Sequence, residues 1–234
     1  MAYARLIARL DVKSPYLIKG VHLEGLRKVG DPHAFAQRYY KEGIDELIYI
    51  DAVASLYERN TIIDLVKSTA KDVFVPIAVG GGVRSVEDAR KLLHSGADKI
   101  AVNTAAIKKP VLIRNLAEEF GDPCVVLSVQ AKRQGDRWEA YTEQGREHSG
   151  RDVFEWIDEA LSHGAGEILL TSVDNEGTGA GFDIELIKQV TDRVDAPVIA
   201  SGGLGRPDHL ISVFTHTGVS AVAAAQVLHW NKIS

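Results

Sequence analysis

The sequence predicts a (β/α)₈ barrel, in which eight parallel strands alternate with helices. Short apolar runs alternate with longer segments whose apolar residues recur every three or four positions. The short runs are apolar on both faces, as is typical of strands buried in a parallel sheet. Eight such runs in 234 residues favour the barrel over a doubly wound open sheet, which is the alternative.

The expected elements follow one another along the whole chain. The strands are expected at residues 4–11, 46–51, 75–82, 99–104, 124–130, 167–174, 196–203 and 220–225. The helices are expected at residues 31–43, 61–70, 85–96, 109–121, 150–164, 183–194 and 206–218. Several of these helices end at a glycine, which is a common helix stop. Between residues 133 and 150 a long polar linker alternates in its middle, which predicts a hairpin that serves as a lid or wall.

The chain also repeats itself with a fixed offset. The segment that starts at Pro76 resembles the segment that starts at Pro197, which lies 121 residues further on. The same offset relates Gly82 to Gly203, Glu46 to Glu167 and Asn103 to Ala224. We therefore predict one barrel domain over residues 1–234, built from halves at about 1–121 and 122–234. In this arrangement Asp11 and Gln130 lie across the barrel mouth from each other.

Composition limits the function classes. Apolar residues make up 45% and charged residues 25% of the chain, and the net charge is −5, so general attraction to nucleic acid or anionic membranes is not expected. No apolar run approaches the roughly 18 residues of a membrane span, and the N-terminus lacks signal-peptide features. The single cysteine, Cys124, is expected to be buried filler and excludes an intrachain disulfide, which suits the cytoplasm. No cluster has metal-ligand spacing, so neither a metal nor a cofactor is expected.

Two glycine-rich strand ends predict phosphate binding. Residues 79–82 and 201–203 each lie one strand before a stretch of small residues, at 103–106 and 223–226. Glycine lets backbone N–H groups approach a phosphate closely. Two such ends related by the repeat would hold a molecule with a phosphate at each end. The alternative, that the glycines only make tight turns, is weakened by the second copy at equal spacing.

Charged residues mark both ends of the predicted barrel. Asp11 and Lys13 end the first strand, where barrel active sites lie, so Asp11 is a candidate general acid or base. A buried ion pair with a lysine is the alternative. Asp51, Asp174 and Glu176 also fall at strand ends. At the opposite end, four alternating charges begin strands and predict a ring, for which stability is the plain interpretation. The ring residues are Arg5, Glu46, Lys99 and Glu167.

Several ordered motifs together resemble one known family. They are RLDVK (9–13), the segment 18–32, GIDEL (43–47), VGGGVRS (79–85), GADKIAVNTAA (96–106), the segment 164–178 and IASGG (199–203). Over nearly its whole length the chain resembles the cyclase subunit of imidazole glycerol phosphate synthase. The resemblance implies a barrel that receives ammonia from a separate glutaminase subunit docked on its N-terminal face. Ammonia would cross the barrel and react with a bisphosphorylated, ribulosyl-bearing aminoimidazole carboxamide nucleotide.

The resemblance also implies roles for individual residues. It places one phosphate at Gly82, Asn103 and Thr104, and the other at Gly177, Gly203 and Ala224. It matches Asp11 to a catalytic aspartate and Lys19 to the lysine of a mobile first loop. It matches the ring of Arg5, Glu46, Lys99 and Glu167 to a charged ammonia gate, and Asp98 to an anchor residue for the glutaminase.

The chain departs from the family pattern at three points. The second catalytic aspartate falls on Gln130, Glu176 replaces an aspartate, and Ala225 replaces a serine. The chain also ends before the family's last helix, which we therefore expect to be short or missing. An amide cannot transfer protons near neutral pH, whereas an acid or base group typically contributes ~10²–10⁴-fold in rate. We therefore expect Gln130 to position substrate and activity on the standard substrate to be weak.

The leading hypothesis is an ammonia-using synthase subunit that works with a class I glutaminase on a phosphorylated sugar-type substrate. The missing carboxylate makes the chain similar to divergent paralogues found with surface-polysaccharide genes. That resemblance implies formation of an acetamidino group on a nucleotide-sugar in lipopolysaccharide biosynthesis. The isomerase of the same pathway fits less well, because it needs no ammonia gate and uses two carboxylates. A scaffold that only docks and activates a glutaminase is the non-enzyme alternative.

Overall fold

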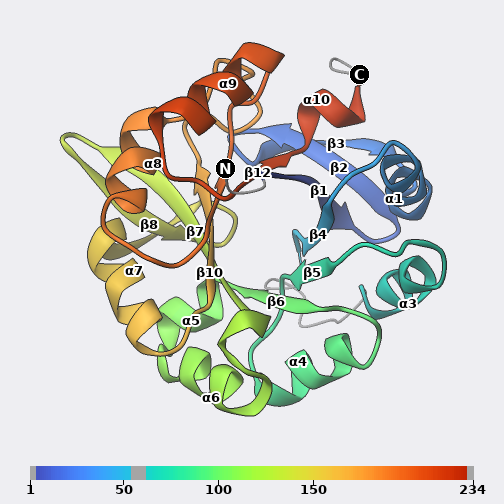
Figure 1. Ribbon diagram of the computed structural model, residues 1–234. Helices are drawn as coiled ribbons and strands as arrows, with labels where there is room; N and C mark the ends of the chain where they lie inside the picture. The colour runs from blue at the N-terminus through green and yellow to red at the C-terminus, as the bar shows by residue number, and fades with distance from the viewer. Residues whose placement is uncertain (1–3, 54–61, 231–234) are drawn as a thin grey trace.

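Eight parallel strands form a closed barrel in the computed structural model, which describes residues 4–53 and 62–230 (Figure 1). Their order is β10–β11–β12–β1–β4–β5–β6–β7, and the pairing of β10 with β7 closes the ring. The barrel strands are β1 (Arg5–Lys13), β4 (Glu46–Asp51), β5 (Ile77–Gly80), β6 (Lys99–Val102), β7 (Val125–Gln134), β10 (Glu167–Ser172), β11 (Val198–Ser201) and β12 (Ala221–Ala224). The predicted fold class is confirmed.

Helices surround the barrel, and all seven expected helical segments contain one (Figure 1). The longer helices are α1 (Pro32–Lys41), α3 (Ile63–Asp72), α4 (Val86–Leu93), α6 (Val111–Phe120), α7 (Val153–Ser162), α8 (Ile184–Thr191) and α9 (Pro207–His216). Two short helices, α5 (Thr104–Lys108) and α10 (Gln226–His229), follow β6 and β12. Side chains that cap helix N-termini explain several starts: Asp31, Ser85, Asp152 and Asp183 each accept a backbone N–H.

The apolar core has two parts. The larger part lies between the outer faces of the strands and the helices. The smaller part fills the barrel interior with side chains from all eight barrel strands. Its members are Ile7, Ile48, Ile50, Ala78, Ala101, Val126, Leu169, Ile199, Ala221 and Ala223. Strands that are buried on both faces explain why their sequences are continuously apolar rather than alternating.

Two antiparallel hairpins extend the barrel beyond its mouth. The hairpin of β8 (Arg137–Thr142) and β9 (Glu147–Asp152) pairs with β7 and confirms the hairpin predicted in the polar linker. The hairpin of β2 (Tyr16–Val21) and β3 (Glu24–Gly30) pairs with β1 and was not predicted. Lys19 therefore lies in strand β2, and its placement in a loop was wrong. The division into half-barrels stays a prediction, although β1 and β7, the first strands of each predicted half, both extend into a hairpin.

Other expectations concern single features. Cys124 lies in a short 3₁₀ turn, η1 (Asp122–Cys124), and is only partly buried, so its interpretation as buried filler was wrong in degree. Partial burial raises the pKa of its thiol. Among residues 4–53 and 62–230, each helix is too short or too polar to cross a bilayer. The same residues contain no group of three or more potential metal ligands.

Candidate functional site

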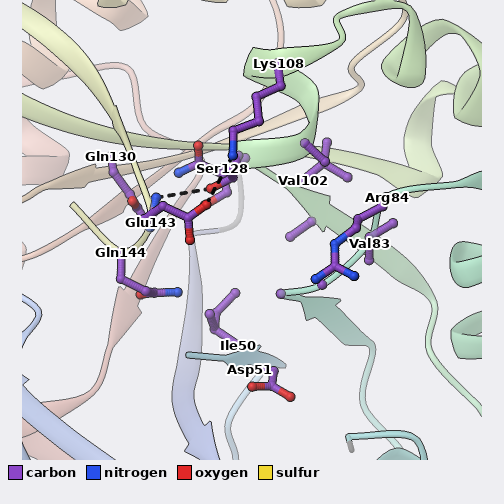
Figure 2. Close-up of a pocket in the computed structure, with 16 residues that line it drawn as sticks. Ile50, Asp51, Val83, Arg84, Val102, Lys108, Ser128, Gln130, Glu143 and Gln144 are labelled. Carbon is purple, nitrogen blue, oxygen red and sulfur yellow. Dashed lines mark hydrogen bonds and ion pairs between the residues drawn. The ribbon is translucent and has the colours of Figure 1, made fainter. Parts of the chain in front are cut away.

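A cavity of about 400 Å³ opens at the C-terminal ends of β4 to β7, and we call it the mouth cavity (Figure 2). The first predicted phosphate set lies together in its wall: Gly82, Asn103 and Thr104. Arg84 and Lys108 add cationic side chains to the same wall. A chain with a net charge of −5 therefore presents local positive groups where an anion was predicted.

The glycines at this end have a conformational reason. Gly81 and Gly82 have φ values of +94° and +76°, which residues other than glycine rarely adopt. A Cβ atom on Gly81 would also collide with the backbone of Asp51. The backbone after β5 can thus turn tightly against the end of β4 and leave the cavity open.

The second predicted phosphate set also lies together, but around a much smaller hollow of about 10 Å³. Gly177, Gly203 and Ala224 line it, together with Glu176. The Glu176 side chain is buried and makes a close ion pair with Lys19 of β2. A carboxylate therefore lies beside the second predicted phosphate position, which makes the two ends of the site unlike each other.

A buried charge network joins the first strand to the hairpin above it. Arg9 Nε donates to Asp11 Oδ1 at 3.0 Å, and Lys19 Nζ lies 3.8 Å from Asp11 Oδ2. Arg9 also donates to Thr171 Oγ1 at 3.1 Å and to Ser201 Oγ at 3.2 Å. The guanidinium of Arg9 thus reaches across the barrel interior just below the mouth and fixes Asp11.

The network sets the protonation of its members. Burial acts to raise the pKa of Asp11, but Arg9 and Lys19 outweigh it, and the pKa is lowered. Burial lowers the pKa of Lys19 to about 8, against the opposing effect of Asp11. Burial, with the charge of Lys19, lowers the pKa of His229 to about 4. Near neutral pH, Asp11 is therefore an ionised carboxylate beside a lysine whose pKa lies within reach of that pH.

Gln130 is buried and lines the mouth cavity, on the opposite side of the barrel mouth from Asp11 as expected. Its Oε1 accepts the backbone N–H of Gly145 at 2.7 Å. The amide thereby anchors the turn between β8 and β9 to the barrel. This contact gives Gln130 a structural role that the sequence did not indicate, beside its predicted role in positioning substrate.

At the N-terminal end of the barrel, the four predicted ring residues form a closed ring of ion pairs. Arg5 pairs with Glu46 at 2.8 Å and with Glu167 at 2.5 Å. Lys99 pairs with the same two carboxylates at 3.0 and 2.7 Å. Burial raises the pKa of Glu46, against the effect of Lys99. Each cation bridges both anions, so the ring closes the bottom of the interior.

Asp98, the predicted partner anchor, lies next to this ring and is exposed. Its Oδ2 also accepts the backbone N–H of Ile77 at 2.8 Å. An exposed hollow beside it is lined by Phe74, whose side chain is 73% exposed. Asp98 therefore supports the start of the neighbouring strand β5 and also adds charge to an exposed, partly apolar surface.

Several residues of the site were missed from the sequence, among them Arg9 and Glu143. Arg9 lies between two apolar residues on β1. It is two residues before Asp11 and therefore lies on the same inward face of the strand, a signal that could have identified it. Glu143, in the turn between β8 and β9, lies in the wall of the mouth cavity (Figure 2). No local pattern marks Glu143, because its placement depends on the hairpin folding back over the mouth.

A barrel with a polar cavity at the C-terminal ends of its strands has the architecture of a (β/α)₈-barrel enzyme. Residues 5–234 match the model of the family described as histidine biosynthesis protein. The imidazole glycerol phosphate synthase subunit HisF of Legionella pneumophila is 61% identical over 207 residues, covering 88% of this chain and 98% of the relative. The HisF subunits of Myxococcus xanthus (48% identical; 98% and 90% covered) and Streptococcus sanguinis (45% identical; 100% and 93% covered) are also similar.

These matches span the whole barrel at high identity. The chain therefore belongs to the family of imidazole glycerol phosphate synthase cyclase subunits, within the histidine biosynthesis proteins, and its family is one of enzymes. The resemblance drawn from the ordered motifs is confirmed.

Proposed function

We propose that this chain is an ammonia-using synthase subunit that joins ammonia-derived nitrogen to a phosphorylated sugar-type substrate at the barrel mouth. A class I glutaminase would dock on the N-terminal face, near Asp98, and supply the ammonia. The observation that carries the proposal is the alignment of two charged sites at opposite ends of one barrel. The ion-pair ring closes the bottom, and the Asp11 network and mouth cavity lie at the top.

Within this proposal Asp11 is the acid or base, because it is ionised and held in place by Arg9. Lys19 assists from β2, where it contacts both Asp11 and Glu176. The mouth cavity would bind a phosphate through Gly82, Asn103 and Thr104. Gly177, Gly203 and Ala224 would form the second phosphate position, next to the Glu176 carboxylate.

The substrate could belong to histidine biosynthesis or to the acetamidino-sugar branch of surface-glycan biosynthesis. One observation favours the second branch. Position 130 carries an amide instead of a carboxylate, and the oxygen of that amide accepts the Gly145 N–H. Incubation with ammonium salt and each candidate substrate, without a partner, tests for turnover; its absence with all of them favours a docking scaffold.

We expect Gln130→Asp to raise formation of imidazole glycerol phosphate from ammonium salt and the standard bisphosphorylated substrate by at least about tenfold. The variant places a proton-accepting group on the side of the mouth opposite Asp11, whereas the wild type should form little product. Gln130→Asn is the matched control, because it has the same length as Asp but cannot take up a proton, and it should give no rise. Wild-type turnover equal to that of an aspartate-bearing relative would contradict this interpretation.

We expect crystals grown in phosphate or sulfate to show an anion in the mouth cavity near Gly82 and Thr104. Backbone N–H groups, Arg84 and Lys108 make this the more favourable end. Occupancy at the Gly203 end should be lower, because the hollow there has a volume of only about 10 Å³. An empty mouth cavity at saturating anion would contradict the assignment of this end as a phosphate site.

A further inference from the structure

The turn between β8 and β9 is fixed tightly over the mouth cavity. Glu143 and Gln144 both have positive φ values, 48° and 61°, which is uncommon for residues other than glycine. The Glu143 N–H donates to Thr104 Oγ1 at 3.1 Å, and the Gly145 N–H donates to Gln130 Oε1 at 2.7 Å. Contacts to two different barrel strand ends therefore hold an unfavourable backbone in one place.

The carboxylate that this turn carries is incompletely paired. Glu143 is only 9% exposed, and its Oε1 lies 3.5 Å from Lys108 Nζ, an ion-pair distance that is long for a hydrogen bond. Its Oε2 is shielded from solvent and has no hydrogen-bond partner among the described residues. A buried carboxylate oxygen without a donor is costly, because it has given up its water. A ligand that brings an N–H group would remove this cost.

The residues around Glu143 indicate which chemical groups a ligand at this position would have. Figure 2 shows the Glu143 carboxylate in the mouth cavity, close to Lys108 and on the same side as Gln130. Thr104, which accepts the Glu143 N–H, belongs to the predicted phosphate set. An anionic group held near Thr104 and Lys108 would therefore place the remainder of the ligand beside the carboxylate. One wall of the cavity thus contains Lys108, which can bind an anionic group of a ligand, and Glu143, which can bind a cationic nitrogen.

We propose that Glu143 is a specificity-determining residue that selects phosphorylated ligands bearing a protonated nitrogen, such as an ammonium or amidinium group. The phosphate binds at the end formed by Gly82, Thr104 and Lys108, and the nitrogen donates to the Glu143 carboxylate. This inference rests on the proposed function, because it takes the mouth cavity as the substrate site. It names the nitrogen-bearing class of substrate that the site accepts. It also explains why a strained turn presents a carboxylate on the side where position 130 has only an amide.

Calorimetric titration of the full chain near pH 7 with ethyl phosphate and 2-aminoethyl phosphate tests the inference without any turnover. The two probes differ mainly by the ammonium group. Because a hydrogen bond to a charged group contributes substantially, the wild type should bind 2-aminoethyl phosphate about tenfold more tightly or better. Glu143→Gln, which keeps the shape but not the charge, should bind the two probes about equally. Lys108→Met should weaken binding of both probes and keep the preference for the amine.

Three results would overturn the inference: no measurable binding of either probe to the wild type, no preference for the amine, or an unchanged preference in Glu143→Gln. Circular dichroism of each variant verifies that the barrel is folded. Ammonia-dependent turnover is measured separately. A retained amine preference without turnover on any candidate substrate would reject the proposed function and keep the binding assignment. Turnover without the preference would reject the binding assignment alone.

Discussion

Asp11→Asn is expected to reduce ammonia-dependent turnover by roughly 10²–10⁴-fold, because it removes the acid or base group that the site holds ionised. It should also destabilise the barrel. Arg9 and Lys19 would stay buried without the carboxylate that they share. Removing one partner of a buried ion pair lowers the free energy of unfolding by about 3–5 kcal/mol. Turnover with ammonium salt and urea unfolding measure the two effects.

A second substitution separates chemistry from stability in this experiment. Arg9→Met combined with Asp11→Asn removes the unpaired cation, so the double variant should regain much of the lost unfolding free energy and none of the turnover. A loss of turnover by Asp11→Asn of less than about tenfold would show that Asp11 is a structural partner of Arg9 instead of a catalytic group.

The acid stability of the chain follows from the same carboxylate. The pKa of Asp11 is lowered in the fold, so its ionisation stabilises the folded state above its usual pKa of 3.8. That contribution is lost as the pH falls through the folded-state pKa. The wild type should therefore lose unfolding free energy more steeply below about pH 4 than Asp11→Asn does. Equal slopes would indicate that Asp11 has the same pKa in both states.

Lys99→Met is expected to lower glutamine-dependent turnover by about tenfold or more in the presence of a class I glutaminase subunit, because it opens the ring at two ion pairs. Turnover with added ammonium salt should change by less than about twofold, since the mouth is untouched. Asp98→Asn should weaken partner binding while keeping an acceptor for the Ile77 N–H. Equal losses in both assays would indicate that the ring is purely structural.

The fold could be predicted from sequence because its signals are local and repeated. Eight doubly apolar runs and the amphipathic segments between them require a parallel sheet covered by helices. The strand-end position of Asp11 and the strand-start position of Glu46 follow directly from that topology. The closed ring of four ion pairs was therefore accessible from residue order alone, and the structure brings its members together.

The β2–β3 hairpin and Glu143 were not predicted from the sequence, because their positions depend on contacts that form when the chain folds back on itself. The β2–β3 hairpin contains Leu17 and Ile18, which are buried and pair with Val12 and Asp11 of the first strand. The polar residues that follow them in the hairpin resemble a loop when the sequence is considered alone. Glu143 enters the site because its N–H contacts Thr104, 39 residues away, and because the Gly145 N–H of the same turn contacts Gln130. Such long-range placement leaves no periodic signal.

Isotope competition tests the central claim, that ammonia from a docked glutaminase crosses the barrel to the mouth. The chain and a class I glutaminase subunit are supplied with amide-¹⁵N glutamine, excess unlabelled ammonium salt and the phosphorylated substrate. Mass spectrometry of the product detects the source of nitrogen even when turnover is slow. The proposed mechanism predicts that the product carries mainly ¹⁵N, and that Lys99→Met shifts it toward unlabelled nitrogen. Product that carries the isotope ratio of the bulk ammonium in the wild type would contradict it.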